Sequence, residues 1–219
     1  MLTDLNPDTL EPVLAEVRAL GVQAIGRALD LRQADQLTLW VSDLGRDCPT
    51  LSVLVNNAGR PSLSKPATQT RVEEWDDTLD VNLKGTFFLT TAFGQWLIDR
   101  QRRGAVISLS STHGSVGLAG ASVYGISKAG ISQMTRMLAI EWAPYGIRVN
   151  AIAPGTTMTE TRAPRLSQPA VGKAMLDRIP LGRFGSPEEM GQAVAYLASP
   201  QASFITGQVL HLDGGLTAY

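Results

Sequence analysis

The chain has 219 residues, a length that suits one α/β domain or two very small ones. Hydrophobic residues make up 44% and charged residues 18%, which is enough apolar material to bury a core and argues against disorder. The 19 lysines and arginines balance 20 aspartates and glutamates. The resulting charge of −1 argues against nucleic acid or an anionic membrane as the main partner.

Cysteine and histidine are scarce in this sequence. Cys48 stands alone, so no intrachain disulfide can form, and the two histidines, His113 and His211, are too few for a His-built zinc site. The N-terminal residues have no signal-peptide pattern, and no apolar run reaches the length of a membrane span. We therefore expect a soluble cytoplasmic protein without a metal site or a membrane partner.

Strand and helix patterns alternate along the chain. Short runs rich in Val, Ile and Leu predict buried strands, and the stretches between them have helical spacing. The first half predicts the tail of a strand at 1–3, a helix at 8–20, a weaker strand at 24–29, a helix at 32–44, a strand at 51–55 and a long helix at 72–100. The second half predicts a strand at 105–109, a helix at 123–142, a strand at 147–152, a helix at 187–198 and a strand at 208–212.

This alternation predicts an α/β fold of one domain over 1–219, a doubly wound parallel sheet with helices on both faces. Ligands bind such sheets beyond the carboxyl ends of the strands. Four predicted strands run into small polar sequences there, at 56–59, 110–114, 153–156 and 213–215. These sequences are either ordinary turns or together form one binding surface on which a ligand approaches the backbone closely. The less regular segment 156–185 predicts a flap with one short helix near 171–179.

Tyr124 and Lys128 are four residues apart, a spacing that places both on one face of the predicted helix. A neighbouring ammonium favours the ionised form of a phenol, and this makes a tyrosine a workable acid or base nearer neutral pH. A half-buried tyrosine beside a solvated lysine gives the same pattern, so the pair alone leaves both interpretations open.

Several motifs taken together resemble the short-chain dehydrogenase/reductase family over essentially the whole chain. They are Asn56-Asn57-Ala58-Gly59, Asn82 within Asp-Val-Asn-Leu, Ser111, Tyr124-x-x-x-Lys128, Pro154-Gly155-x-x-x-Thr159 and Asp213-Gly214-Gly215. The family is Rossmann-like. The resemblance implies an oxidoreductase that interconverts a secondary alcohol and a ketone or aldehyde by hydride transfer, with an NAD(P) cofactor.

The resemblance also implies a role for each matched residue. Tyr124 would be the general acid/base, and Lys128 would favour its ionised form and bind the nicotinamide ribose. Ser111, rather than the adjacent Ser110, would hold the substrate oxygen, and Asn82 would support a water that relays protons to Lys128. The remaining cofactor-binding residues would be Asp4, Asp30, Leu31, Asn56, Ala58, Gly59, Pro154, Gly155, Thr157 and Thr159.

Asp4 bears on the choice of cofactor. In the family, an acid at the end of this strand hydrogen-bonds the adenosine ribose and repels a 2′-phosphate, which favours NAD over NADP. Asp4 can equally be read as a helix-start residue and Asp30 as a helix cap. Alone, Asn82 reads as a polar residue in a helix turn. His113 and Arg162 are candidates to touch the substrate, which the sequence does not identify: sugars, polyols, oxoacyl thioesters and steroids all stay open.

One family feature is missing from the sequence. A strand, a glycine-rich turn and a helix that together hold the cofactor pyrophosphate are not found, and no other segment replaces them. We interpret the chain as an N-terminally truncated version of a normal reductase, with strand edges left unpaired. The alternative is a non-catalytic homologue that acts only through subunit association. A serine hydrolase is a third and weak alternative, because the sequence around Ser127 lacks the second glycine of a nucleophile elbow.

The two long predicted helices, 72–100 and 123–142, carry apolar residues over more than one face. Such stripes are usually core, but family members use these helices as a four-helix dimer interface. We therefore expect a homo-oligomer, a dimer of dimers.

Overall fold

The strands form two parallel groups in the computed structural model, which describes residues 1–218. In the smaller group β1 pairs with β2, and in the larger group the order is β3-β4-β5-β6. The strand bounds are Leu2–Asp4 for β1, Gly26–Ala28 for β2, Val53–Asn56 for β3, Gly104–Leu109 for β4, Ile147–Pro154 for β5 and Val209–Leu212 for β6. All the predicted strands are confirmed, and no end is shifted by more than two residues.

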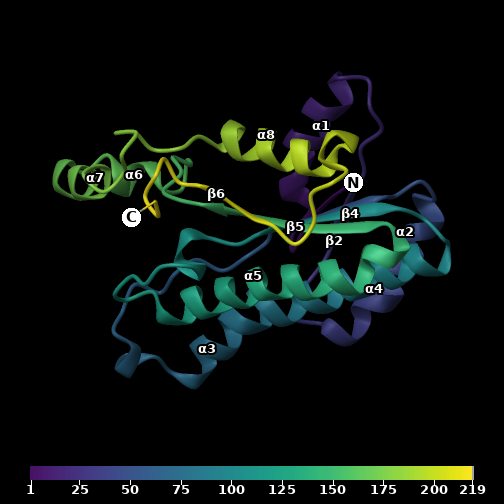
Figure 1. The fold of residues 1–219 in the computed structure, drawn as a ribbon, viewed down its shortest axis with the longest axis horizontal. Coiled ribbons are helices and arrows are strands. Elements are labelled where there is room, and N and C mark those ends of the chain that lie inside the picture. The colour runs from purple at the N-terminus through teal and green to yellow at the C-terminus, as the bar shows by residue number, and fades with distance from the viewer. Residues whose placement is uncertain (219) are drawn as a thin grey trace.

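Helices cover both faces of the larger sheet (Figure 1): α8 lies on one side, and α2, α4 and α5 lie on the other. The helix bounds are Glu11–Ala19 for α1, Leu37–Asp47 for α2, Val72–Leu79 for α3, Thr86–Asp99 for α4, Ser122–Trp142 for α5, Ala163–Leu166 for α6, Pro169–Leu176 for α7 and Pro187–Ala198 for α8. This is the predicted α/β fold of a parallel sheet with helices on both faces.

The two faces have separate hydrophobic cores. The larger cluster joins the sheet to α4 and α5 and includes Phe93, Leu97, Ile131 and Val149, each at most 2% exposed. On the other face, a smaller cluster joins β4 and β5 to α8 through Leu197. Parallel strands that are covered on both faces read as continuous apolar runs, which is why β4 and β5 stand out in the sequence.

The outer edge of β3 lies open. Within residues 1–218, β3 pairs only with β4 and β1 pairs only with β2. Val55 on β3 is 42% exposed, whereas Val106 on the neighbouring β4 is fully buried. An edge strand of this kind presents unpaired N–H and C=O groups. This edge agrees with the unpaired strand edges predicted from the sequence.

Two helical predictions need correction. The predicted helix 72–100 is interrupted by a π-helical segment at Asp80–Gly85, where the hydroxyl of Thr86 donates to the carbonyl of Val81 at 3.2 Å. In the flap there are two short helices, α6 and α7, instead of one near 171–179. Pro164 and Pro169 stand in the first turns of these helices, where the missing N–H costs nothing and φ is already helical. In the part described, no helix is both long and apolar enough to cross a membrane.

Candidate active site

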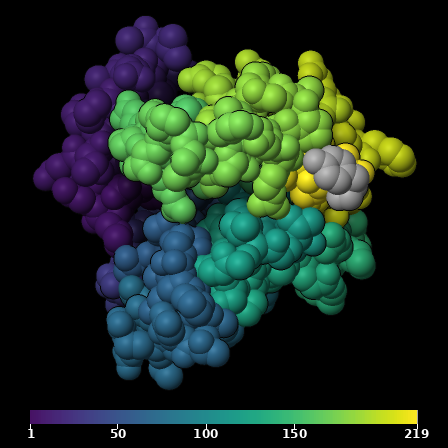
Figure 2. All heavy atoms as spheres, turned by 90° about the vertical axis from the view of Figure 1, so that its left-hand side faces the viewer, coloured from purple at the N-terminus to yellow at the C-terminus, as the bar shows by residue number. Residues whose placement is uncertain are grey.

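The polar sequences that follow the strands gather at one end of the sheet, shown on the left in Figure 1. Figure 2 looks onto this end, where the green segment with α6 and α7 overlies the teal segment that leads into α5. The base of the flap is closed by backbone pairing of Thr157 with Gly185, with Met158 N donating to Gly185 O at 2.8 Å. The flap therefore starts and ends beside the carboxyl end of β5.

Ser111 begins a 3₁₀ turn directly after β4. Its Oγ accepts a hydrogen bond from the backbone N–H of His113 at 3.2 Å, and it also lies 3.2 Å from His113 Nδ1. The His113 ring packs edge-on against the Tyr124 ring, with centroids 6.0 Å apart. Ser110 faces elsewhere, because its hydroxyl bonds the Lys128 carbonyl and Ser132 at 2.9 and 2.7 Å. Of the two adjacent serines, Ser111 is the one on the tyrosine side.

Glycine allows this turn to approach α5. A Cβ on Gly114 would lie 2.8 Å from the Lys128 carbonyl carbon, and a Cβ on Gly125 would lie 3.0 Å from the His113 carbonyl oxygen. A distance of 2.8 Å is essentially never seen for a real Cβ, and 3.0 Å is tighter than most real Cβ contacts, so the two glycines allow the 3₁₀ turn to lie close to the helix. Gly114 therefore has a packing role at this turn.

Tyr124 and Lys128 share one face of α5, as the spacing predicts. Lys128 Nζ lies 5.7 Å from the Tyr124 ring centroid and donates to the Leu109 carbonyl at 2.7 Å. The residue is only 6% exposed, and burial lowers the pKa of Lys128 to about 8. The ammonium is thus still the main form at neutral pH, held at the end of β4 beside a half-buried phenol.

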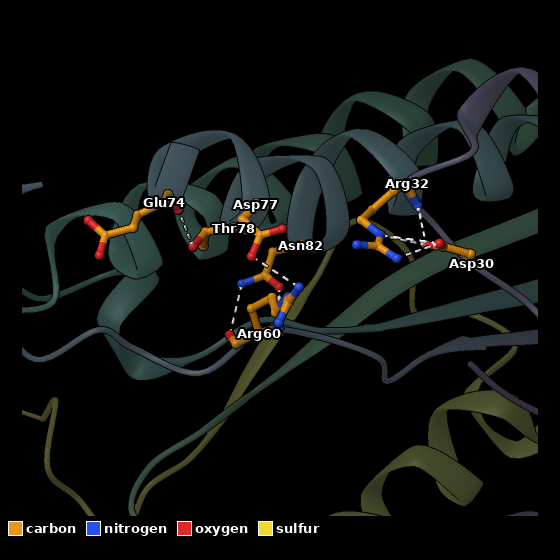
Figure 3. A network of polar contacts seen from close by, with 7 residues as sticks. All are labelled: Asp30, Arg32, Arg60, Glu74, Asp77, Thr78 and Asn82. Atoms are coloured by element: carbon orange, nitrogen blue, oxygen red, sulfur yellow. Dashed lines mark hydrogen bonds and ion pairs between the residues drawn. The ribbon is translucent and has the colours of Figure 1, made fainter. Parts of the chain in front are cut away.

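Asn82 lies in the π-helical segment, and its side chain is 1% exposed. Its Oδ1 accepts from Arg60 N at 2.5 Å, while Nδ2 donates to Arg60 O at 3.1 Å and to Ser127 Oγ at 3.2 Å (Figure 3). The Arg60 guanidinium pairs with Asp77 at 3.0 Å. Asn82 therefore fixes the loop after β3 against α5. The widened helical turn is typical of functional sites.

Ser127 was missed by the sequence analysis as a residue of this network. Its hydroxyl donates to the Tyr124 carbonyl at 2.7 Å and accepts from Asn82, and it is fully buried. It therefore connects the helix that carries Tyr124 to the π-helical segment. Its position directly before Lys128 was the available signal, but the sequence analysis considered Ser127 only as a hydrolase nucleophile.

The segment 56–59, at the end of β3, contains one buried residue with a structural role and three exposed residues. Asn56 is buried, and its Nδ2 donates to Thr90 and Ser108 at 2.8 and 3.0 Å, which joins β3 to α4 and β4. Ala58 and Gly59 are exposed. A Cβ on Gly59 would lie 3.2 Å from Asn82 Oδ1 and 3.5 Å from Lys128 Nζ, so this backbone borders the lysine.

The sequence after β5 also reaches this end of the sheet. Gly155 packs against the Asp213 backbone, where a Cβ would come within 2.9 Å. Thr157 is buried and its Oγ1 has no hydrogen-bond partner within residues 1–218. Thr159 Oγ1 contacts Thr161 at 3.1 Å, and Pro154 ends β5.

The three adenosine-side candidates lie apart from the tyrosine. Asp4 ends β1, and its Oδ1 accepts from Asn6 N at 3.1 Å. Asp30 follows β2 and pairs with Arg32 at 2.7 Å, which lowers the pKa of Asp30 chiefly through that hydrogen bond (Figure 3). Asp30 also accepts from the Arg32 N–H at 3.0 Å in a local turn and does not cap a helix. Leu31 is buried in the larger core cluster.

Positive charge borders the candidate substrate side. Arg162, an exposed residue at the start of α6, and Arg178 both act on His113, whose pKa is lowered first by burial and then by these two charges. Of the predicted substrate residues, His113 contacts both Ser111 and Tyr124, and the charge of Arg162 on the flap acts on His113.

The residues present fit the nicotinamide-ribose half of a dinucleotide. The ammonium of Lys128 has three N–H groups, of which one is bonded to Leu109 O, and the buried Thr157 hydroxyl lacks a partner in the described chain. A buried polar group without a partner in the chain is suited to bonding a polar ligand. Residues 1–218 contain no glycine-rich turn of the kind that binds a pyrophosphate.

A parallel α/β sheet with Ser111 after β4, and with Tyr124 and Lys128 on helix α5, is typical of a dinucleotide-dependent oxidoreductase, and comparison with known proteins specifies the family. Residues 1–217 match the protein family described as Enoyl-(Acyl carrier protein) reductase. The 3-oxoacyl-[acyl-carrier-protein] reductase FabG of Thermotoga maritima is 38% identical over 218 residues, which cover 97% of this chain and 85% of the relative. The chain belongs to the short-chain dehydrogenase/reductase family, whose enzymes act on CH–OH groups with NAD(P).

Two solved structures show the same fold. An NAD⁺-bound xylitol dehydrogenase superposes with a TM-score of 0.91 at 30% identity, covering 97% of this chain and 87% of its own. A gluconate 5-dehydrogenase from Burkholderia cenocepacia, in complex with NADP and tartrate, superposes with a TM-score of 0.92 at 27% identity, covering 100% of this chain and 85% of its own.

Proposed function

We propose that this protein interconverts a secondary alcohol and a ketone or aldehyde by hydride transfer, with Tyr124 as the general acid/base. The observation that carries the proposal is the convergence of four side chains. Lys128 lies beside the Tyr124 ring. Ser111 contacts His113, whose ring packs against Tyr124. Asn82 donates to Ser127, which in turn donates to the Tyr124 carbonyl.

In the reducing direction, Ser111 and Tyr124 hydrogen-bond the carbonyl oxygen and polarise it. The nicotinamide, when bound, supplies the hydride to the carbonyl carbon. The phenol of Tyr124 gives its proton to the oxygen, and the nearby Lys128 ammonium stabilises the phenolate that remains. The reverse direction returns the proton to Tyr124. Asn82 keeps the Arg60 backbone in place and is proposed to support a water on the proton path to Lys128.

The residues proposed to hold the cofactor form two groups. Gly59, Pro154, Gly155, Thr157 and Thr159 would line the nicotinamide side, together with Tyr124 and Lys128. Asp4, Asp30 and Leu31, with Asn56 at the end of β3 and Ala58 in the loop that follows, would serve the adenosine side. The carboxylate of Asp4 at the end of β1 supports a preference for NAD. Solved neighbours bind either NAD⁺ or NADP, so we propose NAD(P) with NAD as the first cofactor to test.

The first substrate class to test is a 3-oxoacyl thioester, because a 3-oxoacyl reductase matches 97% of this chain. The flap 156–185, anchored by the Thr157–Gly185 pairing, is proposed to cover the substrate. Arg162 on this flap, whose charge acts on His113, would contact the substrate.

A second candidate is a non-catalytic homologue that acts through subunit association. The sequence lacks a glycine-rich phosphate turn, and the β3 edge is open, with Val55 at 42% exposure. Titration with NADH and NADPH, followed by quenching of the fluorescence of the four tryptophans, separates the candidates. Saturable quenching that is weakened by Lys128→Met supports the enzyme, and no quenching by either cofactor supports the non-catalytic homologue.

We also propose that the protein is a homo-oligomer, in which a second copy covers the outer face of α4 and α5. A groove on this face is lined by Phe87 and Thr91 of α4 and by Met134 and Met137 of α5. Ile140, also on α5, is 76% exposed. Exposed apolar surface of this kind is typical of subunit contacts. Two such dimers would form the proposed dimer of dimers.

A further inference from the structure

His113 contacts both Ser111 and Tyr124, but the proposed mechanism assigns no role to His113. Its Nδ1 lies 3.2 Å from Ser111 Oγ, and its ring packs edge-on against Tyr124. The backbone of the same residue donates its N–H to the same Oγ at 3.2 Å. Ser111 is only 6% exposed, so few other groups compete for its hydroxyl.

The hydrogen-bonding capacity of Ser111 is limited. A serine hydroxyl has one hydrogen to donate and two lone pairs that accept. The His113 backbone N–H takes one lone pair. If His113 Nδ1 carries a proton, it takes the second lone pair, and the Ser111 hydrogen is left to donate to a ligand. If Nδ1 is unprotonated, it accepts the Ser111 hydrogen, and the hydroxyl can only accept from a ligand.

We propose that His113 is a positioning residue that sets Ser111 as a donor or an acceptor, through the proton on its Nδ1. The donor state suits a carbonyl oxygen, which accepts two hydrogen bonds, and the acceptor state suits the hydroxyl of an alcohol. Each direction of the reaction thus has its own matching state. The inference rests on the proposed role of Ser111 in holding the substrate oxygen.

The charged and titratable groups around His113 keep both states accessible. Tyr124 faces it from α5, Lys128 lies beside Tyr124 one turn further along that helix, and the charges of Arg162 and Arg178 act from the flap. Burial first, and these arginines next, lower the pKa of His113 below its ordinary value, so at neutral pH the ring is uncharged and carries a single proton. At lower pH the ring gains a second proton, and Ser111 is then held in the donor state.

The direct test is nuclear magnetic resonance of the ¹⁵N-histidine-labelled chain, which contains only two histidines. The Ser111→Ala variant should change the Nδ1 shift and the tautomer ratio of His113, lower its pKa further because a charge-assisted bond is lost, and leave His211 unchanged. Ser115→Ala is the matched control: Ser115 Oγ contacts His211 Nε2 at 3.0 Å, so this variant should move His211 and leave His113 unchanged.

Ser111→Thr, which keeps a hydroxyl, should restore the His113 signals and shows that a shift in Ser111→Ala is not general misfolding. His113 signals that are the same with and without the Ser111 hydroxyl overturn the inference. This arm needs neither substrate nor cofactor. It therefore stays readable even if the proposed oxidoreductase activity fails.

Kinetics provide a second arm, with a 3-oxoacyl thioester and NADH or NADPH. In the wild type, KM for the carbonyl should rise severalfold as pH increases through the pKa of His113. His113→Phe keeps a ring beside Tyr124 but removes both nitrogens. It should lower kcat/KM about tenfold, the value of roughly one hydrogen bond, and abolish the pH dependence of KM. A variant that retains the wild-type pH dependence of KM contradicts the inference.

Discussion

Gly114 lies directly against the backbone of Lys128: a Cβ at Gly114 would be 2.8 Å from the Lys128 carbonyl carbon and 2.9 Å from its oxygen. This contact sets how closely the 3₁₀ turn of Ser111 approaches α5. The relative positions of the proposed proton donor and the proposed oxygen holder therefore depend on a residue without a side chain.

The Gly114→Ala variant should lose about 1–3 kcal/mol of stability, because the new methyl group meets backbone that cannot move aside easily. Urea denaturation measures this loss. Gly117→Ala is the matched control, since a Cβ there meets nothing within 4 Å, and it should change stability little. Equal stability of the two variants would show that the turn is not packed as described.

The Asn82→Ala variant should destabilise the protein by about 1–3 kcal/mol, because the Arg60 backbone groups and the Ser127 hydroxyl lose a buried partner. Asn57→Ala, at an exposed asparagine of the adjacent loop, provides the comparison and should be nearly neutral. Denaturation midpoints of both variants test the prediction. A neutral Asn82→Ala would mean that the loop after β3 does not depend on this side chain.

The burial of Lys128 is expected to make the stability of the protein depend on pH. Its pKa falls from 10.5 to about 8 through burial, so below pH 8 the folded and unfolded forms both carry the proton and the buried charge reduces stability fully. Between about pH 8 and 10.5 the unfolded chain binds more protons, and stability rises with pH by up to roughly 3 kcal/mol.

Comparison with Lys128→Met isolates this contribution. The variant has no such proton, so the difference in free energy of unfolding between the two proteins should change across that pH window. Lys84→Met, at an exposed lysine, serves as a control and should give a constant difference. If the free energy of unfolding changes with pH in the same way for wild type and Lys128→Met, the lowered pKa of Lys128 is contradicted.

The sequence predicted those parts of the molecule that depend on local chemistry. α8 begins and ends where predicted because Ser186 and Glu189 form a capping box around Pro187. The Tyr124–Lys128 pairing followed from helical spacing. The π-helical interruption before α4 and the role of Ser127 could not be read in advance, because both depend on contacts between segments far apart in the chain. Asn56 shows the same limit: only tertiary structure reveals its bonds to Thr90 and Ser108.

The proposed subunit contact predicts a change in solution mass. A charged side chain at Met137 or Ile140, as in Met137→Glu or Ile140→Glu, should convert the oligomer to a smaller species, since a buried unpaired charge is costly. Light scattering after size exclusion gives the mass. Leu39→Glu introduces the same charge at a residue of α2 that is 70% exposed, and it should leave the mass unchanged. A monomeric wild type would refute the proposed contact.

The most direct test of the account is NAD(P)H consumption by this 219-residue chain with a 3-oxoacyl thioester, for wild type and Tyr124→Phe. Removal of one phenolic oxygen takes away the proposed proton donor while the ring packing against His113 remains. The account predicts measurable turnover in the wild type and a loss of at least about 100-fold in kcat for the variant. Turnover that is unaffected by Tyr124→Phe would contradict the proposed role of Tyr124 as general acid/base.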